Sequence, residues 1–291
     1  MQKQQIHFVT GKGGVGKSFF AAALAQSLAK MSKFSPQENV SSKATSKPIL
    51  LAEFNDHSFY QEYLGDKPAY FDLAQWTGAE CLKEYAIHLL KIESLYKLFF
   101  ANPISKALID VSPGLHELAI LGRATSFPRK HGPPLKYNHM VFDSFATGHF
   151  LTMLRSPAGL AKIIQLGPMG EQTRSIDQWI RNPEFCHVHL VSLPEELPAT
   201  ETAELYHTLK KEFGLTPKVY LNKYFFLKKE ELKNEPEGVK NYFTNVLEQQ
   251  ELAEKIFKEN KIRYVPVPLI PEIETDKLLH EASEYLLKEV L

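Results

Sequence analysis

The chain has 291 residues, 44% of them hydrophobic and 23% charged, a composition that is typical of a globular protein of enzyme size and excludes a largely disordered chain. Its 34 basic residues balance 34 acidic ones, so nothing in the charge favours nucleic acid as an obligatory partner. Two cysteines exclude a disulfide framework, and we expect a cytoplasmic protein, because the chain shows neither a secretory leader nor a membrane-spanning apolar run.

Short apolar segments alternate with longer helical patterns along the chain. Segments that are apolar at successive positions suit strands covered on both faces, so the alternation predicts a doubly wound, mainly parallel α/β sheet flanked by helices. No internal repeat divides the sequence, and we predict one domain over 1–291. The expected strands are Ile6–Thr10, Ile49–Phe54, His139–Asp143, Cys186–Leu193, Pro217–Asn222 and Ile262–Val267.

The first strand leads directly into the glycine-rich segment Gly11–Ser18, GKGGVGKS. The spacing Gly-x-x-x-x-Gly-Lys-Ser between a strand and a helix is that of a phosphate-binding loop, in which glycines let the backbone N–H groups turn inward around phosphates. We expect Lys17 to reach the β- and γ-phosphates of ATP and Ser18 to ligate magnesium, Mg²⁺. The predicted nucleotide-binding residues of the loop are Gly11, Lys12, Gly13, Gly14, Val15, Gly16, Lys17, Ser18 and Phe19.

The segments after the loop differ in their hydrophobic pattern. A helix over Ser18–Met31 is apolar almost all round and should pack tightly on the sheet. The segment over about 32–47 is rich in Ser, Lys and Thr without a period, which indicates a flexible surface insertion. We predict helical additions to the domain over about 59–110 and 156–185, and an amphipathic C-terminal helix, Leu278–Val290, docked on the core.

The loop contains a second lysine, Lys12, which the minimal phosphate-loop pattern does not require. Lys-Gly-Gly-x-Gly-Lys-Ser resembles the deviant Walker A loop of the group that contains the MinD/ParA ATPases, the nitrogenase iron protein and the arsenical pump-driving ATPase (ArsA) family. In that group the extra lysine reaches across a dimer interface to the phosphates of the partner subunit. The resemblance therefore implies a homodimer in which Lys12 neutralises charge during phosphoryl transfer, as an arginine finger does.

A second motif begins at Asp143, the last residue of an expected strand. Asp143, Thr147, Gly148 and His149 resemble the switch Asp-Thr-Ala-Pro-Thr-Gly-His of the ArsA and tail-anchored-protein-targeting ATPases, with Ser-Phe-Ala in place of the inner Thr-Ala-Pro. The resemblance implies a switch that senses the γ-phosphate. An aspartate at a strand end could also hold Mg²⁺ through water, so we assign the metal to Ser18 and Asp143.

Other segments match the same family in the same order along the chain. His57-Ser58 matches the end of its Asp-Pro-Ala-His-Ser switch, and Ser112-Pro113-Gly114 followed by Glu117 matches its Pro-Gly-x-x-Glu segment. Asn222 matches the adenine-side asparagine, and Pro268 opens the late Pro-Leu-x-Pro loop. The resemblance covers most of the chain and implies the P-loop NTPase fold and an ArsA-like, Mg²⁺-dependent ATPase.

The switch differs from the family pattern at one position. The family's aspartate, the usual positioner of the attacking water, falls on Phe54, which has no proton acceptor. Asp56 or Glu53 could serve if the loop is re-registered, because a base must lie within hydrogen-bond reach of the water. We choose Asp56 as the candidate catalytic residue beside Lys12 and Lys17. The alternative is a nucleotide-binding regulatory or scaffold protein with little or no turnover.

The expected function is therefore that of an ATP-hydrolysing, nucleotide-gated homodimer that switches an unidentified protein partner or client. The metalloid-binding cysteines and the Cys-x-x-Cys zinc motif of family branches are not found, and Cys186-His187-Val188-His189 offers two histidines on one strand face without an evident further ligand. Neutral charge without a basic terminal helix disfavours a DNA-positioning role. No intrinsic membrane anchor is expected, and peripheral membrane contact stays open.

Overall fold

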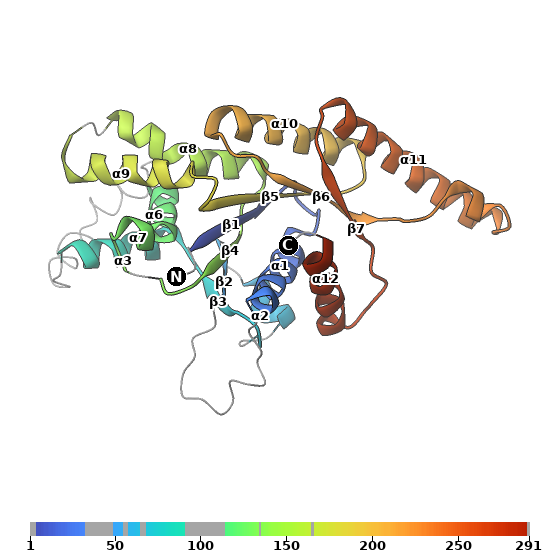
Figure 1. The fold of residues 1–291 in the computed structure, drawn as a ribbon, viewed down its shortest axis with the longest axis horizontal. Coiled ribbons are helices and arrows are strands. Elements are labelled where there is room, and N and C mark those ends of the chain that lie inside the picture. Colours follow the sequence, from blue (N-terminus) through green and yellow to red (C-terminus); the bar gives the residue numbers. More distant parts are fainter. Residues whose placement is uncertain are drawn as a thin grey trace.

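The chain folds around a parallel sheet with helices on both faces (Figure 1). The computed structural model describes residues 4–32, 49–54, 58–64, 68–90, 114–133, 135–163 and 166–289. Within these ranges seven strands pair in parallel in the order β3-β2-β4-β1-β5-β6-β7. The fold is the predicted doubly wound α/β fold, consistent with a P-loop NTPase. The strands are β1 (Gln5–Thr10), β2 (Ile49–Glu53), β3 (Asp72–Gln75), β4 (His139–Asp143), β5 (Cys186–Ser192), β6 (Lys218–Tyr224) and β7 (Tyr264–Pro268).

Every predicted strand is present, with ends shifted by at most two residues, and one further strand was missed. That strand, β3, lies inside the segment over 59–110 that the sequence pattern predicted as helical. It has four residues, Asp and Gln at its ends, and no fully buried side chain. A short, polar strand is typical of a sheet edge, where one side faces solvent, and such a strand carries little hydrophobic pattern to recognise.

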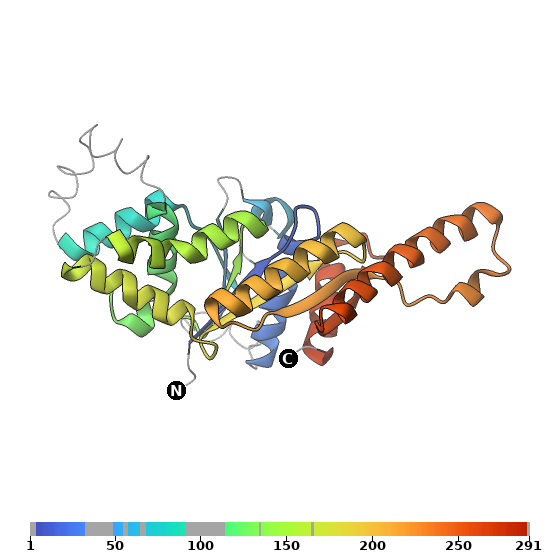
Figure 2. The same ribbon diagram turned by 90° about the horizontal axis from the view of Figure 1, so that it is seen from above.

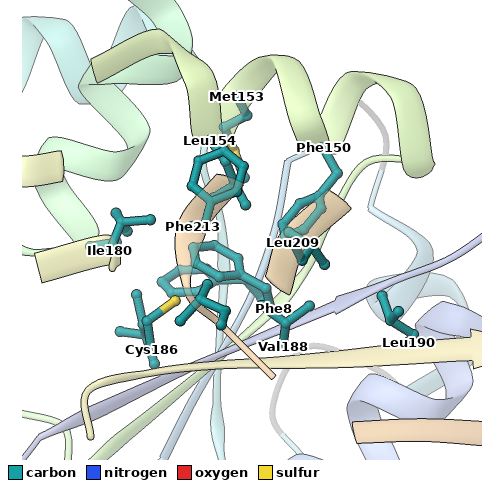
Figure 3. Close-up of a cluster of buried hydrophobic side chains, with 14 of the residues drawn as sticks. Phe8, Phe150, Met153, Leu154, Ile180, Cys186, Val188, Leu190, Leu209 and Phe213 are labelled. Atoms are coloured by element: carbon teal, nitrogen blue, oxygen red, sulfur yellow. The ribbon is translucent and has the colours of Figure 1, made fainter. Parts of the chain in front are cut away.

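One face of the sheet is covered by a layer of long helices (Figure 1). Aromatic and aliphatic side chains of α8 and α10 meet those of β1 and β5 in this layer (Figure 3). At its centre the Phe8 ring lies 5.2 Å from that of Phe142 and 5.6 Å from that of Phe150, between ring centroids. The helices on this side are α3 (Gly78–Leu90), α6 (Leu115–Ala124), α7 (Ser126–Arg129), α8 (Thr147–Ile163), α9 (Gly167–Ile180) and α10 (Glu196–Phe213).

The other face is covered by α1 (Lys17–Met31), α12 (Thr275–Glu289) and the short α2 (Phe59–Leu64). Alanines along α1 let it approach both the sheet and α12 closely, and its middle turns are fully buried. Between the two helices Ser27 Oγ donates to the Ser283 carbonyl at 2.8 Å, and Gln26 Nε2 donates to Ser283 Oγ at 3.1 Å. Each such buried hydrogen bond contributes about 1 kcal/mol. The predicted central helix and the predicted docking of the C-terminal helix are both confirmed.

The 3₁₀ turn η2 (Lys229–Leu232) and helix α11 (Glu237–Glu259) follow β6, and the first turns of α11 project away from the sheet (Figure 2). Near its other end Ala253 and Phe257 are buried in the core on the face that α10 covers. Of the predicted insertion over 32–47, all but Ser32 lies outside the described residues. Within the described ranges, no helix combines the length and the hydropathy that a bilayer crossing requires.

Candidate nucleotide-binding site

The phosphate loop turns at the carboxyl end of β1 and packs against two neighbouring strands. Gly11 has a φ of +152°, and a Cβ there would lie 2.1 Å from the Val191 carbonyl oxygen of β5. Gly16 has a φ of +90°, and a Cβ there would lie 2.7 Å from Asn222 Nδ2 of β6. That amide donates to the Val15 carbonyl at 2.9 Å. These two positions therefore require glycine, and the loop is held in shape from the adjacent strands.

Helix α1 begins at Lys17 directly after the loop, so its first backbone N–H groups face the space that the loop encloses. Lys17 Nζ donates to the Lys12 carbonyl at 2.9 Å. Burial lowers the pKa of Lys17, and the charge of Asp143 acts in the opposite direction. A partly desolvated ammonium group beside a helix N-terminus attracts an anion strongly. The loop therefore has the form of a phosphate site.

A group of oxygen atoms lies beside the start of α1 and supplies a corner suited to Mg²⁺. The Ser18 side chain lies beside the Asp143 carboxylate at the end of β4. Burial raises the pKa of Asp143, while the neighbouring Ser18 side chain and the charge of Lys17 act against that shift. The Tyr60 hydroxyl donates to the Ser18 carbonyl at 2.9 Å and also lies within hydrogen-bond reach of Asp143. We call Ser18, Tyr60 and Asp143 the metal corner, because Mg²⁺ is commonly bound by one or two carboxylates together with substrate phosphates.

An apolar cavity of about 270 Å³ opens next to the loop, between α1, α12 and the ends of β6 and β7. It brings together four predicted nucleotide-binding residues, Gly16, Phe19, Asn222 and Pro268. Lys223, also in its lining, has a φ of +57°, at an irregularity in the pairing of β6 with β7. The preceding residue, Asn222, lies against the loop through its bond to the Val15 carbonyl. Apolar walls with one convergent amide suit a purine base. The other lining residues are Phe20, Ala23, Val267, Leu269, Ile270, Leu278, Ala282 and Leu286.

The predicted switch residues Thr147, Gly148 and His149 begin α8 at the same end of the sheet. The His149 ring stacks on Phe145 with 3.7 Å between centroids, and its Nε2 lies 3.1 Å from Glu117 Oε1. The turn is tied to the loop strand, because Thr10 Oγ1 donates to the Phe145 carbonyl at 2.7 Å. This hydrogen bond therefore connects the strand before the phosphate loop to the residues that precede α8.

Lys12 forms an ion pair within its own chain. Its Nζ lies 2.8 Å from Glu201 Oε1 on α10, and about a third of each side chain is exposed. The predicted role of Lys12 across a dimer requires this pair to open. Glu201 was missed by the sequence analysis, since no local pattern marks an α10 residue as the partner of a loop 189 positions earlier.

Phe54 is a core residue. Its side chain is 7% exposed, and its ring lies 5.5 Å from those of Phe142 and Phe145, between centroids. It therefore packs on the face of the sheet that α6 and α8 cover, opposite α1, and offers no proton acceptor to a nucleotide. Asp56 and His57 lie outside the described residues, so their roles in catalysis and switching stay predictions.

The two histidines predicted on one strand face, His187 and His189, belong to a larger cluster at the amino ends of the strands. His7 Nδ1 lies 3.1 Å from His189 Nε2, and His7 Nε2 lies 3.2 Å from His139 Nδ1. The chain of hydrogen bonds continues from His189 Nδ1 to the Tyr220 hydroxyl at 2.9 Å, and the His187 ring stacks 5.0 Å from that of His7. In the part of the chain that the structure describes, no group of three or more His, Cys, Asp or Glu side chains could hold a metal ion.

These imidazoles are held uncharged by their surroundings. Burial, with the charges of Lys218 and His187, lowers the pKa of His189 to about 3. Burial and the neighbouring imidazoles lower the pKa of His7 well below its usual range. We call His7, His139, His187 and His189 the histidine cluster. The sequence analysis missed His7 and His139, because their place beside His187 and His189 depends on the pairing of β1 with β4 and β5.

Comparison with known proteins gives the family relation. No protein-family model matches the chain. Over 70% of its length the chain is 25% identical to ATPase BagA of Mycobacterium tuberculosis, of which it covers 61%. Over 94% of its length it is 26% identical to a protein of Halobacterium salinarum named as an arsenical pump-driving ATPase, of which it covers 42%. The chain is related to the ArsA-type ATPases.

A third relative agrees with this assignment, the ATPase ASNA1 homolog of Plasmodium chabaudi chabaudi, which is 29% identical over 54% of the chain and of which 37% is covered. The ArsA resemblance predicted from the loop and switch motifs is thereby confirmed. The chain spans less than two thirds of the length of each of these ArsA-type relatives.

Proposed function

We propose that this ArsA-type chain binds ATP with Mg²⁺, hydrolyses it, and works as a nucleotide-gated homodimer that switches a protein partner. The observation that carries the proposal is the continuity of one site at the carboxyl end of the sheet: phosphate loop, metal corner and apolar cavity adjoin one another. These three parts of the site match the phosphates, the metal ion and the base of ATP bound to Mg²⁺. The relatives are named as ATPases, which supports the assignment.

Each residue of the site would have a separate role in hydrolysis. Mg²⁺, when bound, would neutralise charge on the phosphate oxygens. Ser18 would ligate it and Asp143 would hold it through water, while Lys17 and the loop N–H groups would bind the β- and γ-phosphates. The apolar cavity would take the adenine, with Asn222 beside it. Thr147 to His149 would then sense whether the γ-phosphate is present, through the turn tied to Thr10.

Lys12 would make hydrolysis depend on dimer geometry. In the proposed cycle Lys12 leaves Glu201 and reaches the phosphates of the partner subunit when ATP closes the two subunits. A cation added from the partner stabilises the charge that develops in phosphoryl transfer. Product release then lets the pair with Glu201 form again, and the dimer opens.

A second candidate function follows from Phe54. Because Phe54 is packed in the core, the position of the usual water-positioning acid carries none, and the chain could act as a nucleotide-binding scaffold with little turnover. Such a protein would close on ATP and select a partner without completing hydrolysis.

The deciding experiment measures ATP turnover and nucleotide-dependent mass together, on the unaltered protein and on Lys12→Ala. The proposal expects turnover and an ATP-dependent dimer from the unaltered protein, and a turnover lower by about 10³-fold in Lys12→Ala. ATP-dependent dimers without turnover would favour the scaffold. A monomer under every nucleotide would exclude the role of Lys12 across an interface.

A further inference from the structure

An acidic side chain at the end of β2 lies beside the metal corner. Glu53 is 2% exposed, and its Cα pairs in register with that of Asp143 on the adjacent strand β4. Residues in register on parallel strands point to the same face of a sheet. Both carboxylates therefore face α1 and the phosphate loop, and they are close enough for their charges to act on each other.

The pleat of β2 explains why Glu53, and not Phe54, faces the phosphate loop. Successive side chains of a strand point to opposite faces, so Glu53 and Phe54 separate. Ala52 and Phe54 lie in the core on the face that α6 and α8 cover, where Phe54 stacks on Phe142 and Phe145. A shift of one residue in register moves a side chain to the other face. The aromatic contacts of Phe54 fix the register in which the acid is Glu53.

Contacts on the far side of Glu53 hold its carboxylate in place. Glu53 Oε2 accepts a hydrogen bond from the Phe59 backbone N–H at 3.1 Å, in the first turn of α2. The next residue of that helix, Tyr60, reaches back to the Ser18 carbonyl. Glu53 is thus fixed between α2 and the metal corner. An ionised carboxylate can accept about four hydrogen bonds, so one bond to the backbone leaves capacity to hold a water.

We propose that Glu53 takes the part of the missing switch aspartate and positions the water that attacks ATP. This inference rests on the proposed function. The water oxygen forms a bond to the γ-phosphorus as the bond from that phosphorus to the bridging oxygen breaks and its electron pair leaves with ADP. Glu53 accepts one proton of the water and later releases it to solvent. Phe54 contributes by stacking, which keeps Glu53 on the nucleotide side.

The test compares Glu53→Gln with Glu62→Gln, the same change at an exposed residue of α2, and includes Asp56→Asn at the residue predicted from the sequence. A glutamine keeps an oxygen that can accept from the Phe59 N–H, so α2 stays capped, and thermal unfolding checks that the variant is folded. We expect Glu53→Gln to lower ATP turnover by about 10² to 10⁴-fold, the usual contribution of a positioned proton acceptor. Glu62→Gln should keep turnover close to that of the unaltered protein, and Asp56→Asn should lower turnover less than Glu53→Gln does.

A second readout does not depend on turnover. Because Glu53→Gln should bind ATP and Mg²⁺ without completing the reaction, its ATP-bound dimer should persist, which mass measurements at fixed time after ATP addition detect. Glu53→Asp, which restores a carboxylate on a shorter side chain, should recover part of the lost turnover.

Several outcomes separate this inference from the proposed function. Undiminished turnover in Glu53→Gln overturns the role of Glu53 and leaves the ATPase proposal standing. Loss of turnover in Asp56→Asn alone returns the role to Asp56. An unaltered protein that binds ATP with Mg²⁺ but does not hydrolyse it overturns the inference and favours the scaffold, whereas an unaltered protein that binds no ATP overturns the proposed function itself.

Discussion

The two ends of the same sheet hold buried polar groups in opposite ways. At the carboxyl ends, groups of opposite charge, Lys17, Asp143 and Glu53, surround the phosphate loop. At the amino ends, the histidine cluster consists of like groups that bond mainly to one another and to Tyr220. A ligand can replace partners at the first end. At the second end the ring nitrogens of His7 and His189 already have partners, whereas His187 Nε2 is buried without one. Burial of polar side chains alone therefore does not mark a binding site.

The largest expected effect lies at the carboxyl end. Lys17→Ala should lower ATP turnover by about 10³-fold and weaken ATP binding, because it removes the cation aimed at the phosphates. The free energy of unfolding should change little, since the Lys17 ammonium donates its hydrogen bond to a loop carbonyl. Turnover, ATP affinity and urea unfolding measure the three quantities. His139→Gln at the amino end is the matched change, and it should change the free energy of unfolding but leave turnover intact. An equal loss of turnover in this variant would contradict the difference between the two ends of the sheet.

The next effect lies at the amino end and concerns acid. In the folded chain the pKa of His189 is lowered to about 3, whereas an unfolded histidine titrates near about 6.5. Between these values the unfolded state binds a proton that the folded state does not. The free energy of unfolding should therefore fall as the pH drops from about 6.5 toward 3, by up to about 1.4 kcal/mol per pH unit for each such histidine.

Urea unfolding at a series of pH values measures this acid dependence. His189→Gln should flatten it, because glutamine carries no titrating group. His207→Gln is the control, since His207 lies on the surface of α10, hydrogen-bonded to Asn260. If His189→Gln and the unaltered protein lose stability equally with acid, the histidine cluster is not the source.

The smallest effect concerns the pair of Lys12 with Glu201. Glu201→Gln should release Lys12 and favour ATP-dependent dimer formation by up to about fivefold, because partly exposed ion pairs contribute about 0.2 to 1 kcal/mol. The protein concentration at half-maximal dimer formation, with ATP present, reports the change. Glu204→Gln removes a charge one turn along the same helix and should have no effect. A similar shift in both variants would attribute it to net charge alone.

Features that depend on neighbouring residues could be read from the sequence. The strands β1, β4 and β5 are buried on both faces, and each contains consecutive apolar residues. The residues of the phosphate loop after β1 are contiguous in the sequence. Asn222 and Pro268 came from the family resemblance, and the structure places both at the apolar cavity. The edge strand β3 was missed because a short polar segment carries no hydrophobic period.

Features that depend on strand register could not be read in the same way. The meeting of His7 with His139 and His189 joins segments more than a hundred positions apart. Whether Glu53 or Phe54 faces the nucleotide site depends on which face of β2 each side chain occupies. A motif match that counts back from His57 contains no information about that face. The contact of Tyr60 with the metal corner likewise requires α2 to be placed against α1.

The hydrogen bond from Lys17 to the Lys12 carbonyl has a consequence for how ATP would bind. The loop holds its own lysine in a bent, ordered state, so an arriving phosphate exchanges one acceptor for another and does not have to immobilise a free side chain. Fixing a long lysine costs up to about 2 kcal/mol of entropy, and here folding has already met most of that cost. The acceptor that the phosphate replaces therefore belongs to the same loop, five positions before the lysine.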